Sequence, residues 1–128
     1  IADDIRGAVD SFSTDYGCYV FTKQVEDPER FGVVKYDEDG NVVDIIEKPT
    51  TAPSNDAVVG LYMYDSTVFD KIRRLSPSDR QELEVTDLNR LYLEQGLFKS
   101  HKLHGTWIDC GTFDSLARAT QKFYKDNE

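Results

Sequence analysis

The 128-residue chain is long enough for one domain with a hydrophobic core and too short for two ordinary domains, so we expect a single domain over residues 1–128. Acidic residues outnumber basic ones by 24 to 15. This balance argues against nucleic acid as a partner, because binding to a phosphate backbone needs a basic surface. No apolar run approaches the roughly 20 residues that cross a bilayer, so a membrane partner is not expected either.

The amino terminus begins abruptly for a domain. Ile1 and Ala2 are followed by the acidic residues Asp3 and Asp4, which is typical of the end of a strand over residues 1–5, and no targeting segment is visible. Cys18 and Cys110 lack the CxxC spacing, and no His lies near either in sequence. We therefore expect free, reduced thiols in a cytoplasmic protein, while a disulfide remains open because sequence does not give the distance between the two residues.

Three extended runs follow in chain order. Residues 18–25 are rich in aromatic and β-branched side chains and predict a strand. Residues 31–36 and 42–48 are joined by a five-residue loop, Asp-Glu-Asp-Gly-Asn, which has the length and chemistry of a hairpin connection, so we expect them to pair antiparallel. Residues 57–64 predict another apolar strand, in which Gly60 suggests close approach of a neighbouring group.

The stretch 42–49, Val-Val-Asp-Ile-Ile-Glu-Lys-Pro, carries apolar residues on both faces of a strand. That pattern predicts a central strand that is covered on both sides. Pro49 disfavours helix at Lys48 and is expected to hold that residue extended. The strand therefore presents Glu47 and Lys48 at its carboxyl end, which is where ligands bind in open α/β sheets.

The second half of the chain predicts three helices from apolar residues at helical spacing. Thr86 is expected to cap the second helix, which Gly96 ends. Residues 97–103 and 107–109 look extended, and the last helix begins at Thr112. Together these elements predict an α/β fold, with a mixed sheet and flanking helices.

Two aspartates are candidate metal ligands. Asp109 lies between the apolar pair Trp107-Ile108 and the turn into the last helix, and Asp3 has a similar place after Ile1. Carboxylates from neighbouring strand ends suit Mg²⁺, a hard ion that prefers oxygen ligands and shares them with phosphate. The alternative is a pair of solvated acids, which spacing alone favours.

Lys48 and Arg80 are candidate phosphate contacts, although most such side chains merely face water. Glu47 interrupts an apolar strand, and a buried carboxylate needs hydrogen-bond donors. Sugar hydroxyls could supply them, as could a salt bridge to a neighbouring Arg or Lys, which is the more ordinary interpretation of the pattern. The sequence contains no GxSxG, HExxH, GxGxxG, Walker-type or EF-hand motif, so these classes have no motif support.

Five blocks carry a family resemblance. They are Asp-Pro-Glu-Arg-Phe-Gly-Val at 27–33, Ile-Glu-Lys-Pro at 46–49, Ser-Asn-Asp-Ala-Val-Val-Gly-Leu-Tyr at 54–62, Glu-Leu-Glu-Val-Thr-Asp at 82–87 and Trp-Ile-Asp-Cys-Gly-Thr at 107–112. In this order they strongly resemble sugar-1-phosphate nucleotidyltransferases, and most closely the glucose-1-phosphate thymidylyltransferases. The resemblance implies the carboxyl-terminal, sugar-binding part of the Rossmann-like nucleotide-diphospho-sugar transferase fold.

The resemblance also implies a reaction. An oxygen of glucose 1-phosphate would attack the α-phosphorus of dTTP, giving dTDP-glucose and pyrophosphate. Matched by position, Asp3 and Asp109 would hold Mg²⁺, and Lys48 would bind the sugar phosphate with Arg80 close to it. The residues that would contact or line the sugar are Gly32, Glu47, Val58, Gly60 and Tyr62.

The chain departs from the family at three places. Ala2-Asp3-Asp4 stands where the family has Gly-Asp-Asn, Gln81 replaces a usual glycine, and the glycine-rich nucleotide loop with its following lysine does not precede Ile1. We therefore expect a truncated enzyme that is inactive alone and meets dTTP only with the missing amino-terminal part. The alternative is a non-catalytic sugar-phosphate-binding or assembly module. Because the family's sheet continues into the missing part, an exposed edge or apolar face is expected, and with it a homo-oligomer.

Overall fold

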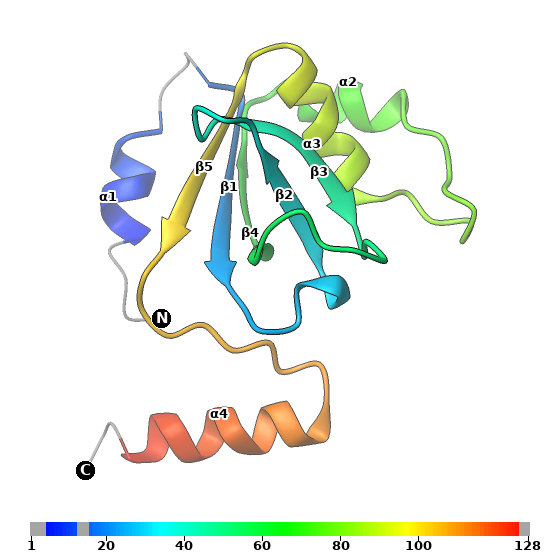
Figure 1. The fold of residues 1–128 in the computed structure, drawn as a ribbon. Helices are drawn as coiled ribbons and strands as arrows, with labels where there is room; N and C mark the ends of the chain where they lie inside the picture. Colours follow the sequence, from blue (N-terminus) through cyan, green and yellow to red (C-terminus); the bar gives the residue numbers. More distant parts are fainter. Residues whose placement is uncertain (1–4, 13–15, 126–128) are drawn as a thin grey trace.

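A computed structural model describes residues 5–12 and 16–125 of the chain. The elements in chain order are α1 (Ile5–Asp10), β1 (Cys18–Gln24), the 3₁₀ turn η1 (Pro28–Arg30), β2 (Gly32–Tyr36), β3 (Val42–Glu47), β4 (Asp56–Tyr64), α2 (Val68–Arg73), α3 (Val85–Glu94), β5 (Phe98–Leu103) and α4 (Phe113–Lys125). The strands of these ranges form one sheet in the order β3-β2-β4-β1-β5. Figure 1 shows helices beside this sheet, which confirms the predicted α/β fold with a mixed sheet.

β1 is the most deeply buried strand of the sheet. β1 pairs antiparallel with β4 and parallel with β5, and its residues from Cys18 to Thr22 are all buried. By contrast β3 forms an edge of the sheet, where Val43 is 48% exposed although Ile45 is fully buried. The prediction that residues 42–48 form a central strand was wrong, because apolar side chains on both faces do not reveal whether a second neighbouring strand is present.

The predicted hairpin is confirmed. β2 and β3 pair antiparallel, with Gly32 opposite Glu47. In the connecting loop the Asp37 carboxylate accepts hydrogen bonds from the backbone N–H groups of Asp39 and Asn41, at 3.0 and 2.8 Å. Gly40 has a φ of +82°, in the left-handed region that glycine adopts without steric cost.

Apolar clusters lie on both faces of the sheet, so the helices cover different sides. The cluster on the α1 side consists of Ala8, Phe21, Val59 and Leu103, with Leu61, Met63 and Trp107 packed against it. The cluster on the α3 side consists of Cys18, Val20, Leu88 and Tyr92, with Val58, Tyr62, Tyr64, Val68, Leu75, Leu97 and Phe98 around it. Alternate residues of β4 therefore contribute to opposite faces, as strand geometry requires.

The helix ends differ in part from the sequence prediction. The N-cap of α3 is Glu84, so Thr86 lies inside the first turn and does not cap the helix. Gly96 has a φ of +71° and ends this helix as predicted, with the Leu97 N–H donating to the Tyr92 carbonyl. Residues 107–109 form no strand, and Figure 1 shows that the long connection containing them leads to α4, which stands apart from the sheet.

None of the helices within residues 5–12 and 16–125 is both long enough and apolar enough to cross a membrane. The prediction for residues 1–5 lies largely outside the described residues, and Ile5 begins a helix.

The two cysteines are free thiols in different surroundings, Cys18 being buried and Cys110 exposed. Burial, together with the nearby charge of Asp65, raises the pKa of the Cys18 thiol to about 12. Because the thiolate is the reactive form, we expect a thiol reagent at pH 8 to label Cys110 and to spare Cys18 in the folded protein. Peptide mapping by mass spectrometry checks this result, and labelling in urea should reach both residues. Equal labelling of both in the folded chain would contradict it.

Candidate functional site

The carboxyl end of β3 meets the first turn of α3. There the Thr86 hydroxyl donates a 2.6 Å hydrogen bond to Glu47 Oε2, and Thr86 is only 4% exposed. Gly32 lies opposite Glu47 on β2. A Cβ atom at Gly32 would come within 3.2 Å of Glu47 Oε2 and 3.3 Å of Thr86 Oγ1. The glycine thus leaves the space in which this hydrogen bond forms.

Lys48 follows Glu47 in an unusual backbone conformation. Its φ is +42°, and its N–H donates to the Phe31 carbonyl at 2.9 Å, which closes the end of the hairpin. The prediction that Pro49 holds Lys48 extended was therefore wrong, because the residue turns into the left-handed region immediately after β3. Its side chain is exposed, so the ammonium group lies at the surface. Left-handed conformations of residues other than glycine are strained and frequently occur at functional sites.

The loop before α3 holds Arg80 in place. The Arg80 guanidinium donates to Glu84 Oε1 at 2.8 Å and forms an ion pair with Glu82 at 3.3 Å. These acceptors raise the pKa of Arg80, the Glu84 hydrogen bond most strongly, and Arg80 and Ser78 lower the pKa of Glu84. Gln81 has a φ of +60°, in the left-handed region that glycine adopts without steric cost.

Charged groups from these elements lie within electrostatic reach of one another. The charge of Lys48 contributes to the lowered pKa of Glu84, and the charge of Glu47 contributes to the raised pKa of Arg80. Burial, followed by the charge of Glu47, raises the pKa of Tyr62. We call Gly32, Glu47, Lys48, Tyr62 and Arg80 the Glu47 cluster: Gly32 pairs with Glu47, Lys48 follows it in the chain, and the charge of Glu47 acts on Tyr62 and Arg80.

The other predicted residues of β4 lie apart from each other. Val58 packs into the apolar cluster on the α3 side. Gly60 lies where β4 shifts register against β1, and no described atom would come within 4 Å of a Cβ there. The expected close approach at Gly60 is therefore absent within the described residues. Gly60 instead opens into a cavity of about 400 Å³ on the α1 side, which Trp107 and Asp109 also line.

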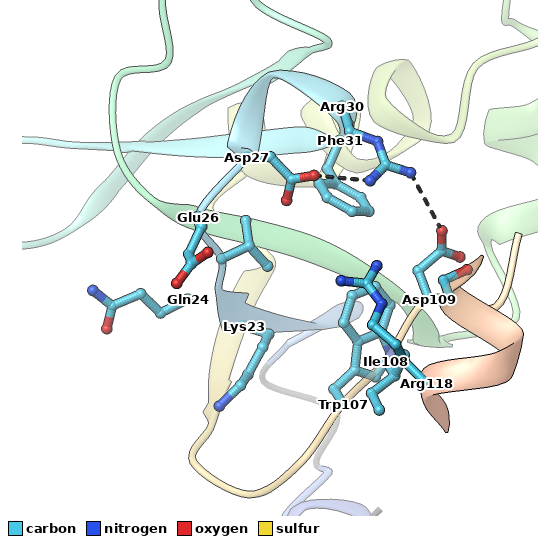
Figure 2. Close-up of a pocket in the computed structure, with 12 residues that line it drawn as sticks. Lys23, Gln24, Glu26, Asp27, Arg30, Phe31, Trp107, Ile108, Asp109 and Arg118 are labelled. Atoms are coloured by element: carbon cyan, nitrogen blue, oxygen red, sulfur yellow. Dashed lines mark hydrogen bonds and ion pairs between the residues drawn. The ribbon is translucent and has the colours of Figure 1, made fainter. Parts of the chain in front are cut away.

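Asp109 lines a second cavity of about 440 Å³ at the end of β1, shown in Figure 2. Its carboxylate is half-exposed and lies 4.0 Å from the Arg30 guanidinium, which also donates a 2.8 Å hydrogen bond to Asp27 Oδ2. Trp107 packs edge to face against Phe31, with ring centroids 5.9 Å apart. The structure therefore brings the Asp109 segment against η1 and the start of β2.

Of the two predicted metal ligands, only Asp109 belongs to the described residues, and Asp3 lies outside them. Among residues 5–12 and 16–125 no group of three or more His, Cys, Asp or Glu side chains could hold a metal ion. Asp109 nevertheless suits Mg²⁺, since its oxygen donors are half-exposed and lie beside two cavities. In proteins Mg²⁺ usually takes one or two carboxylates and completes its shell with water and substrate phosphates.

Sequence reasoning missed the partner of Glu47 and the partner of Asp109. Thr86 was expected to cap a helix, and Arg30 belonged to the block at 27–33 without a predicted role of its own. Glu47 makes no ion pair among the described residues, so the ordinary salt-bridge interpretation is not what the structure shows.

Comparison with known proteins decides the family. The model of the nucleotidyl transferase family matches residues 1–126. The chain belongs to the nucleotidyl transferase family. Among curated members it is 48% identical to a glucose-1-phosphate thymidylyltransferase of Xanthomonas campestris over 107 residues, covering 82% of this chain and 36% of that protein. The low-salt glycan biosynthesis nucleotidyltransferase Agl11 of Haloferax volcanii is 41% identical over 128 residues, covering 98% of this chain and 36% of that protein.

Solved structures agree with this membership in the nucleotidyl transferase family. A Bacillus anthracis protein provisionally named a glucose-1-phosphate thymidylyltransferase, crystallised with sucrose, superposes with a TM-score of 0.85 at 43% identity, covering 94% of this chain and 49% of that one. A UDP-glucose pyrophosphorylase bound to UDP-glucose gives a TM-score of 0.76 at 26% identity, covering 86% of this chain and 45% of that one. The fold predicted from the resemblance is thereby confirmed. The chain spans about a third of the length of the curated members it matches.

Proposed function

We propose that this chain is the sugar-phosphate-binding part of a nucleotidyltransferase that transfers a thymidylyl group from dTTP to glucose 1-phosphate. The observation that carries the proposal is the Glu47 cluster, in which one carboxylate is fixed by Thr86 while Lys48 and Arg80 supply positive charge nearby. The curated glucose-1-phosphate thymidylyltransferases among the relatives support the choice of substrate.

The hydrogen bond to Thr86 leaves one oxygen of Glu47 with no described partner. In the proposed complex this oxygen accepts hydrogen bonds from sugar hydroxyls, for which a carboxylate is a strong acceptor. Gly32 lets the sugar approach the backbone, and Val58, Gly60 and Tyr62 line the sugar pocket. Gly60 also lines the cavity on the α1 side of β4.

The phosphate of the sugar is assigned to the two cations of the cluster. Lys48 supplies a compact charge at the surface, and Arg80 supplies a planar fork that binds two oxygens at once. Arg80 already uses this fork on Glu84, so a phosphate would compete with that carboxylate for the guanidinium. Lys48 is therefore the stronger phosphate contact in this proposal.

Mg²⁺ is the cofactor of the proposed reaction, with Asp109 and Asp3 as its protein ligands. When bound, the ion would neutralise phosphate charge and orient the phosphates for in-line attack. The contribution of this chain is to hold the Asp109 carboxylate at the edge of two cavities, where its oxygens remain accessible.

We further propose that nucleotide binding requires an amino-terminal part carrying the glycine-rich loop. Calorimetry of the purified chain with glucose 1-phosphate and Mg²⁺ should give saturable binding. The same chain should release no pyrophosphate from dTTP and glucose 1-phosphate. A folded chain that does not bind glucose 1-phosphate would overturn the sugar-phosphate site, whereas magnesium-dependent turnover would overturn the need for the second part.

Thr86 offers a specific test of the Glu47 cluster. Thr86→Val keeps the side-chain shape but removes the hydroxyl that fixes Glu47, so we expect glucose 1-phosphate binding to weaken about fivefold to tenfold, the equivalent of one net hydrogen bond of ~1 kcal/mol. Thr86→Ser retains the hydroxyl and is the matched control, with binding close to that of the native chain. Calorimetry measures both dissociation constants. Equal weakening in both variants would contradict the role of the hydroxyl.

We also propose that the chain forms a homo-oligomer. Several large apolar side chains of α4 are exposed in the described part of the chain, namely Phe113, Leu116 and Tyr124. Exposed apolar patches of this kind commonly mark contacts between protein chains. Sedimentation at high protein concentration tests the proposal, and a compact monomer would count against it.

A further inference from the structure

Arg30 stands between two carboxylates at the mouth of the larger Asp109 cavity. Its Nη1 donates to Asp27 Oδ2 at 2.8 Å, and its Nη2 lies 4.0 Å from Asp109 Oδ2, as Figure 2 shows. Asp27 precedes Arg30 by three residues at the start of the η1 turn, so this local contact orients the guanidinium independently of Asp109. A guanidinium that is already oriented loses less side-chain freedom when it meets a second carboxylate.

Side-chain contacts fix the segment that carries Asp109, and one of them is the packing of Trp107 against the apolar cluster on the α1 side. Residues 107–109 form no strand, so they lack the ladder of backbone hydrogen bonds that positions a residue within a sheet. Two side-chain contacts tie the segment to the start of β2: the Arg30–Asp109 ion pair and the edge-to-face contact of Trp107 with Phe31. Arg30 also lies over the Phe31 ring, 5.6 Å from its centroid, and so takes part in both contacts.

The same region of backbone positions Lys48, because the Phe31 carbonyl accepts the Lys48 N–H. We propose that Arg30 is a positioning residue, which holds the Asp109 carboxylate against the hairpin that carries Lys48. The functional meaning of this contact rests on the proposed function, in which Asp109 is a metal ligand. The contact itself is independent of any ligand, and it can be tested without one.

Trp107 is the sole tryptophan of the chain and lies two residues from Asp109, so its fluorescence reports on this segment. Arg30→Gln should release the segment, shift the Trp107 emission to longer wavelength and increase quenching by acrylamide. Arg118→Gln is the matched control, because Arg118 lines the same cavity without a described ion pair to Asp109 and should leave the emission unchanged. If Arg118→Gln reproduces the shift, or if Arg30→Gln causes none, the proposal is overturned.

A double-mutant cycle distinguishes action through Asp109 from a general effect on the fold. Asp109→Asn alone should produce the same emission shift as Arg30→Gln, and the double variant should add nothing further. Additive shifts would overturn the proposal.

A salt titration of the native chain tests the same ion pair without relying on a folded variant. High NaCl should move the native Trp107 emission toward that of Arg30→Gln, because salt screens a half-exposed ion pair. Native emission that is insensitive to salt would also overturn the proposal.

The ligand experiment remains separate. If glucose 1-phosphate fails to bind while the fluorescence cycle behaves as described, the proposed function fails and the positioning role of Arg30 stands. If the fluorescence cycle fails while glucose 1-phosphate binds, the positioning role of Arg30 fails and the proposed sugar-phosphate site stands.

Discussion

Replacing Lys48 with glycine is expected to weaken glucose 1-phosphate binding by about 10- to 100-fold, since hydrogen bonds to charged groups contribute roughly 1.5–3 kcal/mol. Glycine is the appropriate substitution because Lys48 has a φ of +42°, which glycine adopts without strain. The variant therefore removes the charge and leaves the end of the hairpin undisturbed. Calorimetry with glucose 1-phosphate gives the dissociation constant.

Lys35 provides the control for Lys48, as an exposed lysine of β2 outside the Glu47 cluster. Lys35→Ala should bind the sugar phosphate as well as the native chain does. Native-like affinity in Lys48→Gly would remove Lys48 from the phosphate site. A similar loss in both variants would indicate that net charge, rather than a local contact, determines binding.

The largest effect on stability is expected at Gly17, which is buried between β1 and α3. A Cβ atom there would lie 2.6 Å from Tyr92 Cε1 and 2.8 Å from Asp65 Oδ2. Tyr92 is fully buried and donates a 2.9 Å hydrogen bond to Asp65, so neither group can move without disturbing the other. Gly17→Ala should lower the free energy of unfolding by about 1–3 kcal/mol, as overpacked cores do.

Gly60→Ala is the matched control for Gly17→Ala, because no described atom would meet its Cβ within 4 Å. Its free energy of unfolding should stay within about 0.5 kcal/mol of the native value, as for most surface substitutions. Urea denaturation followed by circular dichroism measures both variants. If Gly17→Ala is as stable as Gly60→Ala, the contact between Gly17 and Tyr92 is not tight.

Local patterns predicted local structure well. The hairpin followed from two extended runs and a loop containing Gly40, and the end of α3 followed from Gly96. The position of β3 did not follow, because strand order depends on pairing between distant segments. Pairing between distant segments shows that β2, β4 and β1 each have two neighbours, whereas β3 has one.

The candidate site shows the same division. Glu47, Lys48 and Arg80 were recognisable from residue type and motif. The bond between Thr86 and Glu47 joins residues 39 positions apart, and no local pattern indicates it. A residue before proline usually has an extended backbone, but Lys48 has a left-handed one. In this conformation its N–H donates a hydrogen bond to the Phe31 carbonyl.

The position of β1 between β4 and β5 has a consequence for how the chain folds. Its partners begin only at residues 56 and 98, so during synthesis β1 emerges long before any strand that can pair with it. The β2–β3 hairpin needs only neighbouring residues, and pairing between distant strands is slower because a long loop must close first. We therefore expect the hairpin at the edge to form early, and the parallel pair of β1 with β5 to complete the sheet last.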